Sequence, residues 1–120
     1  TDIKQMLQGD YSSIQGTWRN SEGETLTFKG NKVTGSVDIT QEGVKEVTLN
    51  AGKLYNNTVM AISEPKTHFD ARIFLFAAKN TSPSDYKDNT DKTRDRLFIE
   101  TNGGNAYFEE VTEKAFYRIN

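Results

Sequence analysis

The chain has 120 residues, of which 34% are hydrophobic and 27% charged, with a mean hydropathy of -0.73 and a formal net charge of -2. A chain of this length builds one sizeable hydrophobic core, so we expect a single domain over residues 1–120. The small negative charge offers no positive field for phosphates, which argues against nucleic acid as a partner. The longest apolar run, residues 73–78, is far shorter than the ~20 residues that cross a bilayer, so no membrane segment is expected.

The first elements are a short helix followed by strands. Asp2 is a favourable N-cap and Gly9 is a stop signal, so a helix is expected over residues 2–8. From Ile14 the apolar residues recur with a period of two, which Gly16 and Trp18 continue. After a turn at residues 21–23, the same alternation runs through residues 26–28 and 33–39. One face of each strand is therefore expected in the core, and the other in water.

Turn signals then recur about every ten residues, as in a meander of short antiparallel strands. Further strands are expected over residues 44–49, 53–63, 72–78, 97–101, 106–111 and 115–119, with a hairpin turn at Asn102 and Gly103. A meander of about eight or nine strands must close on itself or fold into two sheets, because a long open edge invites aggregation. We therefore predict an all-β, up-and-down antiparallel barrel with a short N-terminal helix.

Two segments depart from the regular pattern. Residues 79–95 form a polar stretch that is too long for an ordinary hairpin loop, and loops of this length are usually functional or mobile. The strand expected at residues 72–78 is apolar on both faces, so we expect its outer face to be covered by the N-terminal helix or by the 79–95 loop. On its inner face, Phe74 and Phe76 either line a ligand cavity or fill the core, since barrels of about eight strands do either.

No catalytic or metal-binding constellation stands out. The sequence has no cysteine, and its only histidine, His68, is accompanied by no G-x-S-x-G motif. A calcium loop that began at Asn89 would place Arg94 where the sharp turn requires glycine. Glycine-rich phosphate-binding loops of the common forms are also absent. We therefore predict no enzymatic activity, no metal site and no cofactor.

A G-x-W motif at residues 16–18, on the first strand and behind a short helix, resembles the opening of the lipocalin and avidin barrels. In that group the tryptophan plugs one end of the barrel, and in lipocalins it packs beside a late arginine. The resemblance implies these structural roles for Trp18 and Arg118, with cation–π stacking between them. The stretch is also similar to streptavidin-like proteins, which implies a ligand contact for Asn20. Glu24 stands where that family has serine, and Trp18 is the only tryptophan, so biotin is not the expected ligand.

Residues 9–28, G-D-Y-S-S-I-Q-G-T-W-R-N-S-E-G-E-T-L-T-F, and the stretch D-K-T-R-D-R-L at residues 91–97 carry a second resemblance. They resemble a C-terminal domain of unknown function found in lipoproteins of streptococci, enterococci and related bacteria. That resemblance implies an extracellular location on a Gram-positive cell surface, through a lipid anchor in the full-length precursor. The chain begins at Thr1 without a signal sequence, so we expect the leader and the anchor to lie outside it.

Two functional hypotheses remain from the sequence. The leading one is a non-enzymatic cell-surface binding domain that holds a small ligand or a cell-wall component in its barrel. A ligand site needs a few polar groups among apolar walls, and the residues expected to line it are Asn20, Tyr55, Arg72, Phe74 and Phe76. The alternative is a protein–protein interaction or inhibitor module with a filled core, which binds an envelope protein through the 79–95 loop or a strand edge.

Overall fold

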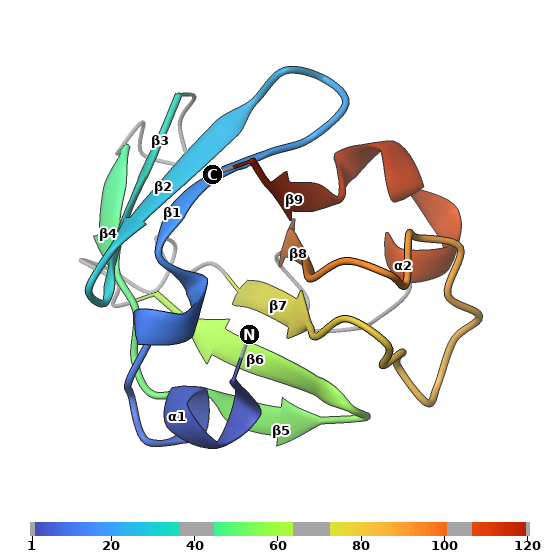
Figure 1. Ribbon diagram of the computed structural model, residues 1–120, viewed down its shortest axis with the longest axis horizontal. Coiled ribbons are helices and arrows are strands. Elements are labelled where there is room, and N and C mark those ends of the chain that lie inside the picture. Colours follow the sequence, from blue (N-terminus) through green and yellow to red (C-terminus); the bar gives the residue numbers. More distant parts are fainter. Residues whose placement is uncertain (1, 37–44, 64–72, 101–106, 120) are drawn as a thin grey trace.

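The computed structural model describes residues 2–36, 45–63, 73–100 and 107–119. Within these residues the chain forms a nine-stranded antiparallel sheet with two short α-helices and two 3-10 helices (Figure 1). In chain order the elements are α1 (Ile3–Leu7), η1 (Ser12–Ile14), β1 (Gly16–Arg19), β2 (Thr25–Lys29), β3 (Lys32–Gly35), β4 (Glu46–Thr48), β5 (Lys53–Tyr55), β6 (Thr58–Ile62), β7 (Ile73–Ala77), β8 (Arg96–Glu100), α2 (Tyr107–Glu110), η2 (Thr112–Lys114) and β9 (Phe116–Arg118).

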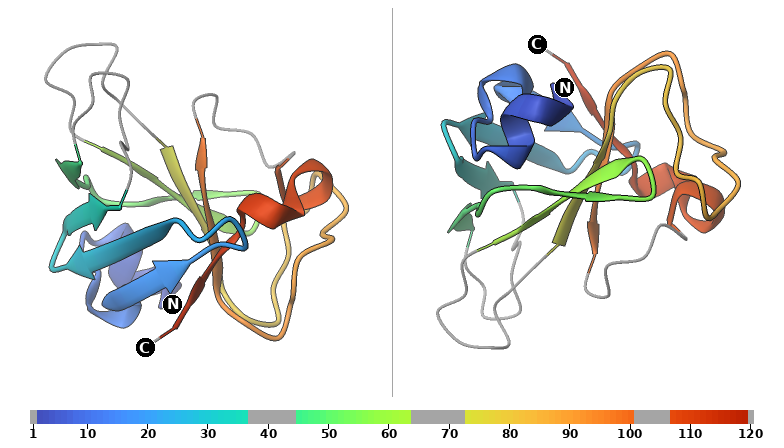
Figure 2. Two further views of the ribbon diagram at one scale, coloured as in Figure 1. Left: turned by 90° about the horizontal axis from the view of Figure 1, so that it is seen from above. Right: turned by 90° about the horizontal axis from the view of Figure 1, so that it is seen from below.

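The sheet curls into a barrel-like form, as the two views of Figure 2 show. Its strand order is β4-β3-β2-β1-β9-β8-β7-β6-β5, so every neighbour is consecutive in the chain except β9, which pairs with β1. An antiparallel bridge between Leu49 and Ser63 links the end of β4 to the end of β6, and the Asn50 N–H donates to the Ile62 carbonyl at 3.0 Å. The two sides of the sheet therefore meet. The predicted fold class, an all-β barrel-like meander behind a short N-terminal helix, is confirmed.

The N-terminal helix lies where the sequence places it. The Asp2 side chain accepts a hydrogen bond from the Gln5 N–H at 3.1 Å, which satisfies one of the free donors of the first turn. Gly9 follows the helix with a φ of 85°, a left-handed conformation that glycine adopts without a steric penalty. Met6 on this helix is buried in the core of the barrel.

The single strand predicted over residues 53–63 is wrong, because the segment folds into the β5–β6 hairpin. Asn56 and Asn57 form its turn with φ values of 47° and 70°. Two left-handed residues in succession define a turn whose twist matches the strands, and asparagine tolerates this conformation. The Thr58 hydroxyl donates to the Tyr55 carbonyl at 2.6 Å across the turn.

The strand predicted over residues 106–111 is also wrong, because Tyr107–Glu110 form helix α2. A helical turn gathers Tyr107, Phe108 and Val111 on one side, where they pack against the outer face of β7 and β8; an extended strand would alternate them. The Phe108 ring lies 4.7 Å from the Phe98 ring, centroid to centroid. The apolar cover of this outer face thus comes from α2 and its surroundings, not from the N-terminal helix or the 79–95 loop. The predicted turn at residues 102–103 lies outside the described residues.

Four aromatic rings fill the middle of the barrel. Trp18, Phe28, Phe74 and Phe76 are all at most 1% exposed. The ring of Phe76 lies 6.3 Å from that of Trp18 and 5.8 Å from that of Phe28, and Phe28 lies 6.5 Å from Phe74. Edge-to-face and tilted ring contacts at such distances are those of close-packed aromatic cores. The inner face of β7 therefore belongs to a packed core.

Gly52 marks the tight contact between α1 and the barrel. Its N–H donates to the Met6 carbonyl at 2.9 Å, and a Cβ placed on it would lie 2.5 Å from Cγ1 of the buried Val59. Because a β-branched side chain in a packed core cannot move aside, Gly52→Ala is expected to lower the free energy of unfolding by about 1–3 kcal/mol. Urea denaturation measures this difference. The exposed change Ala51→Ser is the control, and equal stability of the two variants would contradict the predicted clash.

Candidate binding surface

The residues predicted to line a ligand site do not converge. Asn20 follows β1, and its buried side chain stabilises the β1–β2 turn. Its amide oxygen accepts hydrogen bonds from the N–H groups of Glu22 and Glu24, and its amide nitrogen donates to the Glu24 carboxylate at 2.8 Å. Tyr55 ends β5, which runs opposite to β1 in the antiparallel order, so Asn20 and Tyr55 lie at opposite ends of the barrel. Phe74 and Phe76 lie in the core between them. Arg72 lies outside the described residues, as does His68.

Trp18 and Arg118 are paired across β1 and β9, near one end of the barrel. The guanidinium carbon of Arg118 lies 5.0 Å from the centroid of the Trp18 ring, a cation–π distance. The indole N–H of Trp18 donates to the Ile14 carbonyl at 3.0 Å, and Arg118 donates to the Ser13 carbonyl. These contacts hold η1 against this end of the barrel.

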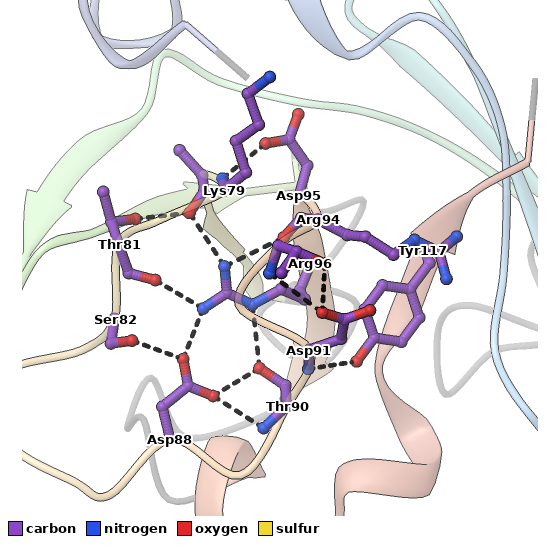
Figure 3. Close-up of polar contacts among 12 residues, drawn as sticks. Lys79, Thr81, Ser82, Asp88, Thr90, Asp91, Arg94, Asp95, Arg96 and Tyr117 are labelled. Atoms are coloured by element: carbon purple, nitrogen blue, oxygen red, sulfur yellow. Dashed lines mark hydrogen bonds and ion pairs between the residues drawn. The ribbon is translucent and has the colours of Figure 1, made fainter.

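The 79–95 loop leaves the same end and is folded around a residue that the sequence analysis missed. Arg96, the first residue of β8, is fully buried (Figure 3). All five N–H donors of its guanidinium have an acceptor, which is the full complement that arginine can make. The acceptors are the Thr90 hydroxyl at 2.9 Å, the carbonyls of Ala78, Arg94 and Thr81 at 2.9, 3.1 and 2.7 Å, and the Asp88 carboxylate at 2.5 Å.

Asp88 completes this network from within the loop. Burial acts to raise the pKa of its carboxyl group. Three partners act in the opposite direction: Thr90 donates hydrogen bonds from its side chain and backbone, Ser82 donates one more, and Arg96 adds its positive charge. Together they outweigh burial and hold the pKa of Asp88 below its usual value. Asp88 is therefore ionised at neutral pH and forms a buried ion pair with Arg96.

The lowered pKa of Asp88 makes the loop sensitive to acid. A group whose pKa is lower in the folded than in the unfolded chain adds stability above its unfolded pKa, about 3.9 for aspartate, and loses that contribution as the pH falls through the folded pKa. The difference in unfolding free energy between the wild type and Asp88→Asn is thus expected to be constant near pH 6 and to shrink below about pH 4. Urea denaturation at pH 6, 4 and 3 checks this.

Asp10 and Asp91 also have lowered pKa values, chiefly through side-chain hydrogen bonds from Ser12 and Thr93 respectively, so the wild type loses stability in acid for several reasons. Comparing the two chains at each pH isolates the part due to Asp88. A difference that stays the same from pH 6 to pH 3 would show that Asp88 does not carry the effect.

The loop is also fastened to its neighbours. The Ser84 N–H donates to the Asn56 carbonyl at 3.0 Å, which ties the loop to the β5–β6 hairpin. On the other side the Asn89 N–H donates to the Phe108 carbonyl at 2.9 Å, and the Lys87 N–H donates to the Glu109 carboxylate at 3.1 Å. Figure 1 shows the loop beside α2. The segment that the sequence marked as a long polar loop is therefore a folded surface.

The described residues include two hollows, one of them at the base of the loop, and exposed apolar side chains on the loop and on β5. A groove of about 500 Å³ lies at the base of the loop and is lined by Ala78, Lys79, Arg94, Asp95 and Arg118. A second, more apolar groove of about 310 Å³ lies along β5 and β6 and is lined by Asn50, Ala51, Lys53, Met60 and Ile62. Tyr86 in the loop is 44% exposed, and Leu54 on β5 is 61% exposed.

The described residues hold no group of three or more histidine, cysteine, aspartate or glutamate side chains that could ligate a metal ion. In the segment considered as a calcium loop, the Asp91 carboxylate accepts hydrogen bonds from the N–H and the hydroxyl of Thr93. Of the helices within the described ranges, none has the length and apolar character needed to cross a bilayer.

The curled sheet, the aromatic core and the folded loop define a barrel-like all-β domain. The chain belongs to the family described as Domain of unknown function (DUF6287), which matches residues 1–120. No curated protein and no solved structure matches the chain.

Proposed function

We propose that this chain is a non-enzymatic binding domain of a lipid-anchored bacterial surface protein, and that it binds a protein of the cell envelope through the 79–95 loop. The observation that carries the proposal is the loop itself, which is folded around the fully buried Arg96 through a network of hydrogen bonds. A loop that is already ordered loses little conformational entropy when it binds, and this lowers the free-energy cost of association.

The core favours this proposal over a small ligand inside the barrel. Phe74 and Phe76, the two rings expected to line a cavity, pack against Trp18 and Phe28 instead. Side chains thus occupy the centre of the barrel between β1, β2 and β7. A packed centre between these described strands supports binding on the outside of the barrel.

The loop surface has the character of a protein interface. Tyr86 is an exposed aromatic residue on a rigid support, and tyrosine is enriched among the residues that contribute most to protein interfaces. The location on a Gram-positive cell surface is supported by the resemblance of residues 9–28 and 91–97 to lipoprotein domains.

The experiment first identifies the partner and then maps the contact. A photo-crosslinking amino acid at position 86 is expected to capture one envelope protein, which mass spectrometry identifies. With that protein purified, Tyr86→Ala should weaken binding at least tenfold, or about 1.4 kcal/mol. Leu54→Ala removes another exposed apolar side chain, on the β5 edge, and serves as the matched control. If Leu54→Ala weakens binding and Tyr86→Ala does not, the strand edge binds the partner and the proposal is wrong.

A further inference from the structure

The groove at the base of the 79–95 loop, which we call the basic groove, gathers three cations on a chain whose net charge is negative. Its lining includes Lys79, Arg94 and Arg118, with Asp95 as the one carboxylate. These residues come from the two ends of the loop and from β9. Figure 3 shows Lys79, Asp95 and Arg94 close together where the two ends of the loop meet.

Both arginines of the basic groove are held in place by aromatic rings. The guanidinium carbon of Arg94 lies 4.4 Å from the centroid of the Tyr117 ring, and Arg94 donates to the Arg118 carbonyl at 3.1 Å. Arg118 lies over Trp18 and donates to the Ser13 carbonyl, and its buried Nε has no hydrogen-bond partner. Ring stacking fixes a guanidinium without using its N–H donors, and each of these arginines has further N–H donors besides the one that it gives to a carbonyl group.

No ion pair between described residues joins a carboxylate to these cations, although the Asp91 carboxylate lies close enough to Arg94 to feel its charge. The ion pairs formed there are Arg96 with Asp88 and Lys114 with Glu22. Asp95 uses one carboxylate oxygen to accept a hydrogen bond from the backbone N–H of Lys79 at 2.8 Å, which joins the two ends of the loop. The basic groove therefore keeps a local charge of opposite sign to the whole chain.

We propose that the basic groove binds a phosphoryl group of a soluble phosphorylated ligand. Guanidinium groups donate paired hydrogen bonds to phosphate oxygens, and a lysine adds a mobile positive charge. A tetrahedral phosphoryl group offers oxygens in several directions to converging donors, whereas a planar carboxylate is satisfied by one guanidinium. The groove, at about 500 Å³, has room for the group that carries the phosphate as well. This site does not depend on the protein that the loop binds through Tyr86.

A titration followed by ¹⁵N nuclear magnetic resonance tests the proposal on the intact chain. Glycerol 3-phosphate is the probe, with inorganic phosphate beside it, and glutamate and sodium chloride at equal ionic strength are the comparison solutes. Saturable shifts are expected at residues 78, 79, 94, 95 and 118, including the side-chain Nε–H signals of Arg94 and Arg118. Binding should weaken as salt is raised, because it depends on charge. Equal shifts with glutamate or chloride, or no saturable shift with either phosphate, would overturn the proposal.

Matched variants locate the site. Lys79→Gln and Arg94→Gln together should weaken glycerol 3-phosphate binding at least tenfold, since both residues are exposed and neither belongs to the core. Lys87→Gln removes one exposed charge elsewhere on the same loop and should leave the affinity within twofold. Equal weakening by Lys87→Gln would show a diffuse charge effect and overturn the proposal. Sedimentation with phosphatidylglycerol vesicles, without binding of glycerol 3-phosphate, would also overturn it and assign the groove to a membrane surface.

Phosphate binding by the basic groove can be tested separately from protein binding through Tyr86 of the loop. Tyr86→Ala should leave phosphate binding unchanged, and the Lys79→Gln, Arg94→Gln double variant should leave the crosslink at position 86 intact. If both activities are lost together in either variant, while circular dichroism shows a folded chain, the groove is part of the protein-binding surface and is not an independent phosphoryl site.

Discussion

Arg96→Met is expected to lower the free energy of unfolding by about 3–5 kcal/mol, because the change leaves the buried Asp88 carboxylate without its cation. Methionine keeps most of the side-chain volume but none of the five hydrogen bonds. Three of those bonds hold carbonyl groups at both ends of the loop, so the loop should also open. Urea denaturation measures the loss of stability, and limited proteolysis within residues 79–95 measures the opening.

Arg94→Met is the matched control for this prediction. Arg94 lies two residues earlier and is exposed. Its side chain makes one hydrogen bond and one ring contact, so its loss should cost no more than about 1 kcal/mol. A second comparison removes both partners, since replacing a buried ion pair by apolar residues often costs far less than breaking it. The double variant Arg96→Met, Asp88→Leu should therefore be more stable than the sum of its single changes indicates. If Arg96→Met costs less than about 1 kcal/mol, the network does not stabilise the loop.

Much of the fold follows from local patterns in the sequence. The N-cap at Asp2, the alternation around Trp18 and the turn before Thr25 each depend on residues close together in the chain, so each could be predicted. The wrong predictions concern segments whose structure depends on contacts with residues that are distant in the chain. Tyr107 and Phe108 favour a strand locally, but residues 107–110 form a helix, which packs its apolar side chains on the outer face of β7 and β8.

The candidate surface was harder to predict than the fold for the same reason. Arg96 begins an apolar strand, where an arginine usually projects to solvent, and its acceptors come from four residues of the polar loop and from Ala78 just before it. One signal was present in the sequence: Asp88, Asp91 and Asp95 precede Arg96, an arginine at the start of a buried strand. The pairing of Trp18 with Arg118 could be expected only through the resemblance to lipocalins, since 100 residues separate them in the chain.

Phe76→Ala is expected to lower the free energy of unfolding by about 3–5 kcal/mol, which is the usual cost of removing a ring from a packed core. Phe76 is fully buried and contacts both Trp18 and Phe28, so its loss leaves a void that these rings cannot close. The same change distinguishes the two functional hypotheses. A ring that lined a hollow ligand cavity would contact water or ligand on one side, and its removal would cost much less. Urea denaturation of the unliganded chain gives the answer.

Tyr55→Ala is the control for Phe76→Ala, because Tyr55 is an aromatic residue of the predicted ligand site that lies partly exposed at the end of β5. It should cost clearly less than Phe76→Ala, since a half-exposed ring buries less apolar area. A packed interior also predicts that Phe76→Ala creates an apolar cavity, and such cavities take up small apolar molecules such as benzene. Benzene should therefore stabilise Phe76→Ala and leave the wild type unchanged. Stabilisation of the wild type by benzene would reveal a cavity already present in the barrel and would restore the hypothesis of an internal ligand.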